Sequence, residues 1–107
     1  MLYFDWDPPK EAENIEKHGI SFGAASVALE DPYAIEEEDQ VVDGEQRLLT
    51  VGMAAGEVVV LVSHENYYFN DGLDEMARII HARRASAGER RDYDELRAQS
   101  GWNSTDF

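Results

Sequence analysis

The 107-residue chain contains no cysteine, and this absence excludes disulfide bonds, thiolate metal sites and cysteine nucleophiles. Long hydrophobic runs are also missing. The longest, Val58–Val62, is far below the roughly 18 residues that a membrane span needs. Residues 1–7 lack the basic and apolar regions of a secretion signal. We therefore expect a cytoplasmic protein without a membrane partner.

Basic residues are scarce, with 9 Lys and Arg against 23 Asp and Glu, and the formal net charge is −14. This sign disfavours a nucleic-acid partner, because phosphate binding usually needs a basic surface. The charge is uneven, however. Residues 1–75 hold 18 acids and 3 bases, whereas residues 76–107 hold 5 acids and 6 bases, all of them arginine. The arginines between Arg78 and Arg91 are either a solvated face that pairs with the chain's own acids or a local anion site.

The length suits one domain, and a hydrophobic share of 43% is typical of globular proteins. Local patterns predict a strand at 2–6, a helix ending near 18, a second helix between 21 and 31, strands at 33–37, 47–53, 57–64 and 76–84, and a helix from 86 to about 99. We expect an α+β fold in which a small antiparallel sheet of four to five strands packs against two N-terminal helices and one C-terminal helix. The polar strand at 33–37 is expected at an edge, and residues 100–107 are expected to form a loose tail.

Several residues mark the ends of the expected helices. Asp7 precedes two prolines and can cap the first helix, and Gly19 can end it in the left-handed conformation. Ser21 is placed to cap the second helix. The spacing of Ser86 and Glu89 is that of a capping box, which predicts the start of the last helix.

Three blocks of residues occur in an order typical of one family. The first is Phe4-Asp5-Trp6-Asp7-Pro8 with Lys10, Asn14, Lys17-His18-Gly19-Ile20-Ser21-Phe22, Ala25 and Asp31-Pro32; the second is Asp43-Gly44-Glu45 with Arg47 and Gly52; the third is Arg78-Ile79-Ile80, Ala82-Arg83-Arg84-Ala85, Glu89-Arg90-Arg91 and Tyr93. With these blocks the chain resembles the BrnT toxins of bacterial type II toxin–antitoxin systems, which have a RelE-like ribonuclease fold.

The resemblance implies a BrnT-like toxin domain over residues 1–99 that cleaves mRNA as an endoribonuclease. It also implies a BrnA-like ribbon-helix-helix antitoxin, in a complex of two toxins and two antitoxins that reaches operator DNA only through the antitoxin. No cofactor is expected, and the three histidines lack the spacing of a metal site.

The chain departs from the family pattern at three places. His81 stands where the family usually has serine, Asn66 stands where we expect arginine, and the segment 66–75 is longer than usual. These differences can change the details of the site. The overall charge is also more acidic than suits an RNA-cutting protein, and a second hypothesis is therefore a catalytically degenerate BrnT-like module, which binds an antitoxin and acts only in co-repression.

Metal-independent RNA cleavage needs a base for the 2′-hydroxyl, an acid for the leaving 5′-oxygen and cations for the charged phosphorane. From the family blocks we expect Arg83 and Arg78 to stabilise the transition state. Lys17 and His18 are expected to transfer protons or position the substrate, with His81 or His64 as substitutes. The expected site comprises the catalytic residues Lys17, His18, Arg47, Arg78, His81 and Arg83, the RNA-binding residues Arg84, His64 and Glu65, and the antitoxin-binding residues Arg90 and Arg91.

Several of these residues also have a purely structural interpretation. Lys17 and His18 lie where cations stabilise the C-terminus of a helix. Arg47 can pair with Glu45 or with an acid of a neighbouring strand, and the pair His64–Glu65 can be a plain strand end.

Strand alternation bears on the arginines near the C-terminus. It places Arg78 and Arg84 on one sheet face and His81 and Arg83 on the other, unless a bulge intervenes. Arg90–Arg91 can hold antitoxin acids, acids of this chain or phosphate.

The aromatic run at 67–69 has two interpretations, whereas Tyr93 has one. Tyr67-Tyr68-Phe69 can stack RNA bases, or can fill the core or a dimer contact of a hairpin. Tyr93 is expected to pack against the sheet with its hydroxyl at the rim.

Overall fold

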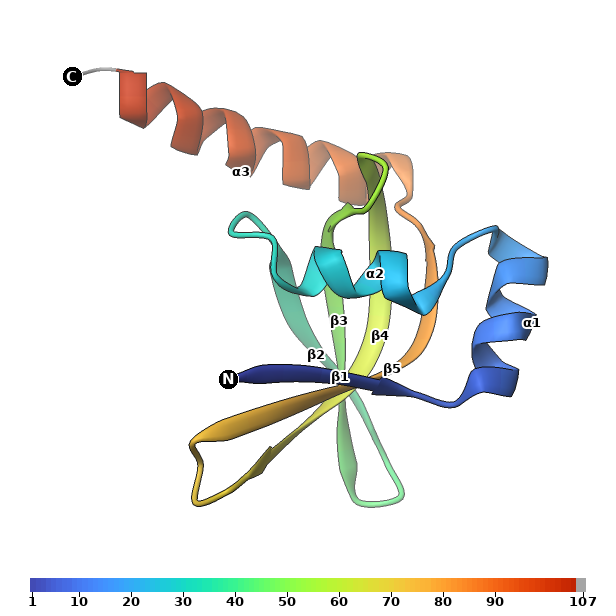
Figure 1. Ribbon diagram of the computed structural model, residues 1–107. Helices are drawn as coiled ribbons and strands as arrows, with labels where there is room; N and C mark the ends of the chain where they lie inside the picture. Colours follow the sequence, from blue (N-terminus) through green and yellow to red (C-terminus); the bar gives the residue numbers. More distant parts are fainter. Residues whose placement is uncertain (106–107) are drawn as a thin grey trace.

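Five strands form one sheet in the order β1-β5-β4-β3-β2. A computed structural model describes residues 1–105, and the side chains up to residue 100 (Figure 1). The elements are β1 (Leu2–Trp6), α1 (Pro8–His18), α2 (Phe22–Leu29), β2 (Ile35–Val42), β3 (Glu45–Ala54), β4 (Val58–Phe69), β5 (Asp74–Arg84) and α3 (Ala87–Thr105). Figure 1 shows α2 across one face of the sheet, α1 beside β5, and α3 at the end opposite the two long hairpins.

The α+β class and the arrangement of the helices are confirmed, but the expectation of an antiparallel sheet is wrong. β1 pairs in parallel with β5, and the other strands pair antiparallel, so the sheet is mixed. The physical reason is that β1 pairs with a strand more than 70 residues later in the chain. No hairpin connects the two strands, and their relative direction is therefore set by the long path between them.

The predicted signals at the helix ends are largely confirmed. Gly19 adopts φ 69° at the end of α1, and the Ser21 hydroxyl accepts a hydrogen bond from the Ala24 amide at the start of α2. Asp7 is the N-cap residue of α1, although its side chain makes no capping hydrogen bond. Ser86 and Glu89 form the reciprocal bonds of a capping box, 2.8 and 3.2 Å long.

Element lengths differ from the expectation at three places. β2 begins later than predicted and extends to Val42, although it is the edge strand that we expected. β4 continues to Phe69, so the aromatic run lies on a hairpin, where Tyr68 is 71% exposed and does not fill the core. α3 continues through Thr105, which makes residues 100–105 helical and not a loose tail, and residues 106–107 lie outside the described part.

A bulge in β5 overturns the predicted alternation of its side chains. His64 pairs with Ile79 and Ser63 pairs with His81, so Ile80 is an extra residue in the ladder. As a result Ile79 and Ala82 pack in the same core cluster. Side chains that precede the bulge therefore change face relative to those that follow it.

The bulge separates the two arginines that we expected on one face of the sheet. Arg78 shares the face opposite α2 with Arg83, whereas Arg84 faces the side of α2 and lines a cavity with Ile20 and Ala24. The expectation that Arg78 and Arg84 share a face is wrong, because strict alternation holds only in an unbulged strand.

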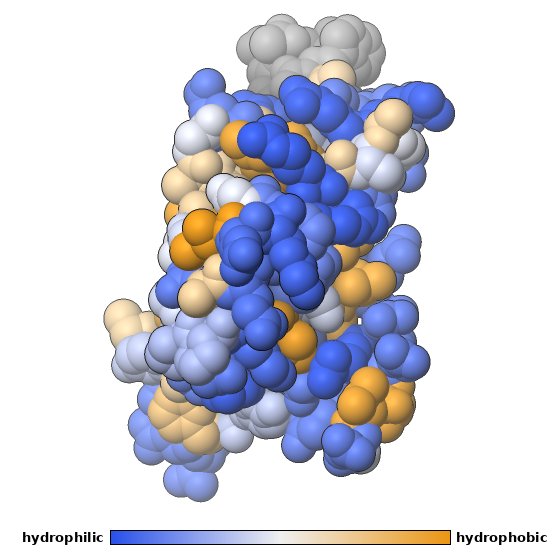
Figure 2. Space-filling view, turned by 90° about the vertical axis from the view of Figure 1, so that its right-hand side faces the viewer, coloured by the Kyte–Doolittle hydropathy of each residue, from blue (hydrophilic) through white to orange (hydrophobic). Residues whose placement is uncertain are grey.

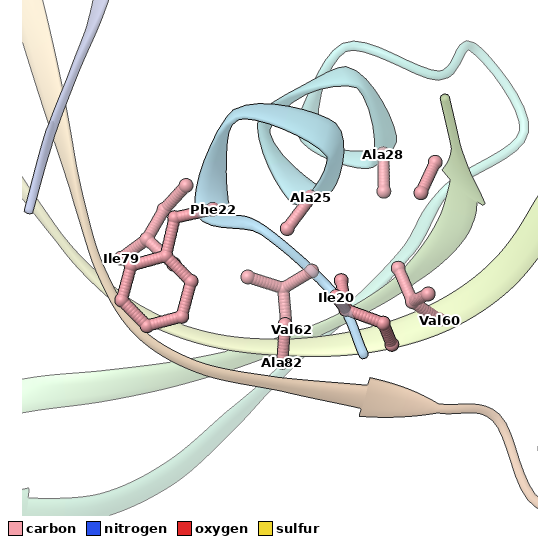
Figure 3. Close-up of a cluster of buried hydrophobic side chains, with 9 residues drawn as sticks. Ile20, Phe22, Ala25, Ala28, Val60, Val62, Ile79 and Ala82 are labelled. Atoms are coloured by element: carbon pink, nitrogen blue, oxygen red, sulfur yellow. The ribbon is translucent and has the colours of Figure 1, made fainter. Parts of the chain in front are cut away.

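Each face of the sheet carries a hydrophobic cluster. The first lies under α2 (Figure 3) and contains Ile20, Phe22, Ala25, Ala28, Ala54, Val60, Val62, Ile79 and Ala82. The second lies on the opposite face and contains Val51, Val59, Leu61 and Tyr93. Tyr93 is 1% exposed, and its hydroxyl donates to Asp31. Burial and this bond raise the pKa of Tyr93 to about 12, which keeps the phenol protonated as a donor.

α2 approaches β3 closely at one glycine. A Cβ atom built on Gly52 would lie 2.5 Å from the backbone oxygen of Ala28, so only glycine fits here without a shift of the helix. Among the described residues, no helix is long and apolar enough to cross a membrane.

Candidate functional site

The side chain of Asn14 fixes α1 against an open part of β5. β1 pairs with β5 only as far as Ile79, which leaves Ala82 without a backbone partner on that edge. Asn14 Nδ2 donates to the oxygens of Ala82 (2.8 Å) and Ile20 (2.9 Å), and the Ala82 amide donates to Asn14 Oδ1 (3.1 Å). Asn14 is 4% exposed. Its amide group thus takes the place of a neighbouring strand.

This attachment brings two histidines together. His18 lies one turn after Asn14 on the same face of α1, and His81 precedes Ala82 in β5. The two Nε2 atoms are 3.2 Å apart, and the rings are perpendicular with their centroids 5.0 Å apart. At such a contact one nitrogen donates and the other accepts. The geometry therefore requires at least one of the two imidazoles to be neutral.

The charges around the pair favour the neutral form of His81. Burial lowers the pKa of His81, and the positive charges of His18, Arg83 and Lys17 lower this pKa further. His81 is therefore mostly neutral at pH 7 and can accept a proton. The face of the molecule on which α1 lies is mostly hydrophilic (Figure 2).

Arg83 is held beside this pair by the start of α3. Its Nη1 and Nη2 atoms bind the two oxygens of Glu89 at 2.9 and 3.0 Å, and Nη1 also donates to the Arg84 oxygen at 3.0 Å. The bond from Arg83 lowers the pKa of Glu89, whose carboxylate also takes part in the capping box with Ser86. The guanidinium is oriented by these contacts, and a guanidinium has further N–H groups for an anion.

Arg47 and Arg78 lie apart from the histidine pair. Arg47 Nε binds Glu65 at 2.9 Å, and Glu65 also accepts a bond from the Tyr67 hydroxyl. Arg78 forms an ion pair with Asp5 of β1. Of the two partners that we considered for Arg47, the acid of the neighbouring strand is the one found. Both arginines are thus bound to carboxylates of the chain itself.

His64 is buried on the α2 side of the sheet and is 2% exposed. Its Nδ1 lies 2.7 Å from Asn66 Oδ1, and its Nε2 lies 2.8 Å from Thr50 Oγ1. Because Asn66 Nδ2 donates to Glu75, its Oδ1 is the acceptor, and His64 therefore carries its proton on Nδ1. Burial lowers the pKa of His64. It is a satisfied interior histidine, on the other sheet face from Glu65.

The structure thus divides the expected catalytic set. Lys17 and His18 end α1 beside the last part of β5, which carries His81 and Arg83, and Arg83 is bound to Glu89 of α3; Arg47 and Arg78 lie on the sheet nearer the hairpins. The remaining expected residues lie elsewhere: Arg84 lines a cavity, Arg90 pairs with Asp94 along α3 at 3.6 Å, Arg91 is exposed, and His64 and Glu65 are buried.

Two important residues were not singled out from the sequence. Asn14 entered only as one letter of a family block, and the only signal in the sequence is its spacing of four residues from His18, which places both on one face of a helix. Glu89 was expected only as a capping residue, and its bidentate contact with Arg83 was not foreseen. Among the described residues, no group of three or more His, Asp or Glu side chains is arranged to hold a metal ion.

Comparison with known proteins assigns the sequence to a family. No curated protein matches the sequence. Residues 6–89 match a family model described as the ribonuclease toxin BrnT of type II toxin–antitoxin systems. The matched range includes the histidine pair, Arg83 and Glu89, and it covers most of the chain. The chain belongs to the BrnT family of ribonuclease toxins of type II toxin–antitoxin systems.

Proposed function

We propose that this chain is a metal-independent endoribonuclease of RelE-like fold that cleaves mRNA with the His18–His81 pair. The observation that carries the proposal is the 3.2 Å contact between the two Nε2 atoms. A neutral imidazole beside a second imidazole supplies a proton acceptor and a proton donor at one place. These are the two groups that RNA cleavage needs, and the reaction requires no metal ion.

In the proposed reaction the ribose 2′-oxygen attacks the adjacent phosphorus. The new bond joins phosphorus to the 2′-oxygen, and the bond between phosphorus and the 5′-oxygen breaks. Neutral His81 takes the proton of the 2′-hydroxyl, and protonated His18 gives a proton to the leaving 5′-oxygen. The products are a 2′,3′-cyclic phosphate and a 5′-hydroxyl.

Two cations are placed to stabilise the charge that develops on the phosphorane. Arg83 is oriented by Glu89 and contributes to the positive potential at His81. Lys17 adjoins His18 and acts on the pKa of His81 in the same sense, so its charge reaches the same region. Charges fixed in advance at the reacting phosphate lower the barrier without reorganisation in the transition state.

A type II toxin implies an antitoxin partner. We propose a BrnA-like ribbon-helix-helix antitoxin in a complex of two copies of each protein, which contacts operator DNA through the antitoxin. The exposed side of α3 with Arg90 and Arg91 is a suitable contact for acidic antitoxin residues. This arrangement leaves DNA recognition to the antitoxin, in keeping with the acidic charge of the toxin.

One observation favours a second candidate function. Arg47, Arg78 and Arg83 each bind a carboxylate of the chain itself, which competes with phosphate for the guanidinium groups. A toxin in which these pairs persist would bind its antitoxin and act only in co-repression, without cleaving RNA.

Incubation of the purified protein with end-labelled single-stranded RNA in EDTA separates the two functions. The proposal predicts fragments with 2′,3′-cyclic phosphate ends, which disappear with His81→Gln or with added antitoxin and persist with Lys10→Ala, a matched change on the exposed side of α1. A folded protein that binds the antitoxin and leaves RNA intact would support the second function.

A further inference from the structure

A single buried side chain attaches α3 to the rest of the protein. Among residues 87–100, whose side chains the structure describes, only Tyr93 is buried, and the residues on both sides of it are exposed. Figure 1 shows that α3 begins after β5 and then extends past the sheet. A largely polar helix with so little packing is marginal in water on its own. The contacts that hold Tyr93 therefore also hold the first turns of α3.

The hydroxyl of Tyr93 is bound by Asp31, which lies in the turn between α2 and β2. The hydroxyl donates to Asp31 Oδ2, and this oxygen also accepts from the Met53 amide of β3 at 2.8 Å. The other oxygen, Oδ1, accepts from the Tyr33 amide at 2.9 Å. Burial raises the pKa of Asp31, but these hydrogen bonds and the nearby charge of Arg97 lower this pKa overall. One ionised carboxylate thus connects α3 with β3 and with the end of α2.

Glu89 lies one turn before Tyr93 in the same helix. Its carboxylate makes the two contacts with Arg83, at 2.9 and 3.0 Å, and closes the capping box with Ser86. Both functions of Glu89 require that the first turn of α3 is formed beside the end of β5. The terminal turns of a helix fray where nothing anchors them. The contacts therefore form a series that runs from Asp31 through Tyr93 and Glu89 to Arg83.

We propose that Asp31 and Tyr93 are positioning residues for RNA cleavage, because they fix the start of α3 and with it the Glu89 carboxylate that orients Arg83; this inference rests on the proposed function. A guanidinium that is fixed in advance stabilises the phosphorane without reorganisation in the transition state. A guanidinium that turns freely loses part of this effect. Loss of the Asp31–Tyr93 contact should therefore lower kcat more than it changes KM.

The orientation of Arg83 can be measured by NMR without RNA. Contact with both oxygens of Glu89 hinders rotation of the guanidinium, so the Arg83 Nη protons should give separate signals, which are assigned by their loss in Arg83→Ala. Tyr93→Phe keeps the ring and removes the hydroxyl, and Asp31→Ala removes the acceptor. Both variants should broaden or merge the signals of Arg83.

Tyr33→Phe is the matched control. Tyr33 packs against the same hydrophobic cluster as Tyr93, and its hydroxyl makes no hydrogen bond with the described residues. The change therefore removes a phenol hydroxyl from the same region without breaking the connection to α3. The signals of Arg83 should remain separate in this variant.

Kinetics with a single-stranded RNA in EDTA test the effect on the reaction. Asp31→Ala should lower kcat about five- to tenfold and Tyr93→Phe about two- to threefold, with KM changed less than about twofold, while Tyr33→Phe leaves both constants unchanged. In a Glu89→Ala background, Tyr93→Phe should not lower kcat further, because the connection to Arg83 is already broken. It should still lower Tm, which separates positioning from a contribution to stability alone.

The inference is overturned if the Arg83 signals stay separate in both Asp31→Ala and Tyr93→Phe, if Tyr33→Phe merges them as well, or if Tyr93→Phe and Glu89→Ala lower kcat independently. Circular dichroism checks that each variant is folded, and Tyr93→Phe decides the question if Asp31→Ala does not fold.

The NMR result also distinguishes this inference from the proposed function. Merged signals in the variants of a protein that leaves RNA intact refute the proposed cleavage alone, and the positioning of Arg83 by Asp31 and Tyr93 then stands. Separate signals in the variants of a protein that cleaves RNA refute the positioning alone.

Discussion

Replacement of Asn14 by alanine should loosen α1 from β5 and separate the two histidines. The change removes three hydrogen bonds from a side chain that is 4% exposed. At about 1 kcal/mol for each bond, the free energy of unfolding should fall by about 3 kcal/mol. In a chain of this size that loss corresponds to roughly 10–20 °C in Tm.

Urea denaturation followed by circular dichroism measures this loss. Asn14→Asp is an informative companion, because a carboxylate can accept from the Ala82 amide but cannot donate to the oxygens of Ala82 and Ile20. We expect Asn14→Asp to be at least as destabilising as alanine. A loss below about 1 kcal/mol for Asn14→Ala would refute the view that this side chain replaces a strand.

Three further predictions concern other parts of the molecule. Gly52→Ala should destabilise the fold by about 1–3 kcal/mol, because the new Cβ meets the Ala28 oxygen; unchanged urea unfolding would contradict this. Because the pKa of His81 is lowered in the folded state, NMR titration should give a value below 6.5, and its share of the stability, present above 6.5, should be lost as pH falls from 6.5 through the lower pKa of the folded state; a value above 6.5 would contradict the lowering of this pKa by burial and the nearby positive charges. In cells that express the toxin without an antitoxin, Arg83→Ala should relieve the arrest of protein synthesis. Glu89→Gln should relieve this arrest to a smaller extent, since it leaves the Arg83 guanidinium in place. Full arrest of protein synthesis by the Arg83→Ala protein would exclude the proposed role of Arg83.

Local features of the fold were predictable because neighbouring residues determine them. A glycine that adopts a left-handed conformation at Gly19, a serine N-cap at Ser21 and the capping box at Ser86 each require only a few consecutive residues. The strands were found for the same reason, by apolar patterns over short windows. Their lengths in the hairpins were missed, since β4 continues into polar and aromatic residues that are half-exposed.

Long-range features were not predictable from the patterns. The parallel pairing of β1 with β5 joins residues more than 70 positions apart, as in Asp5 and Arg78. The bulge at Ile80 has no sequence signal that we identified, and it decides which arginines share a face. Both features depend on how the helices pack on the sheet, and local propensity does not encode this.

In the candidate site, several of the residues were expected from the sequence, but the contacts between them were not. His18 and His81 were both expected in the site, on the strength of a family block and of general chemistry. Their contact was not expected, because it depends on three hydrogen bonds from Asn14. Arg83 was expected beside the substrate, and the structure adds Glu89 as the group that orients it.

The most direct test of the catalytic account is the cleavage of a defined single-stranded RNA in EDTA by the wild-type protein and by His81→Gln, with both proteins shown to be folded. The account predicts 2′,3′-cyclic phosphate products from the wild type and a loss of at least a hundredfold in rate for the variant, in line with the usual contribution of a general base. Equal cleavage by both proteins would contradict the proposal that the His18–His81 contact is the catalytic centre.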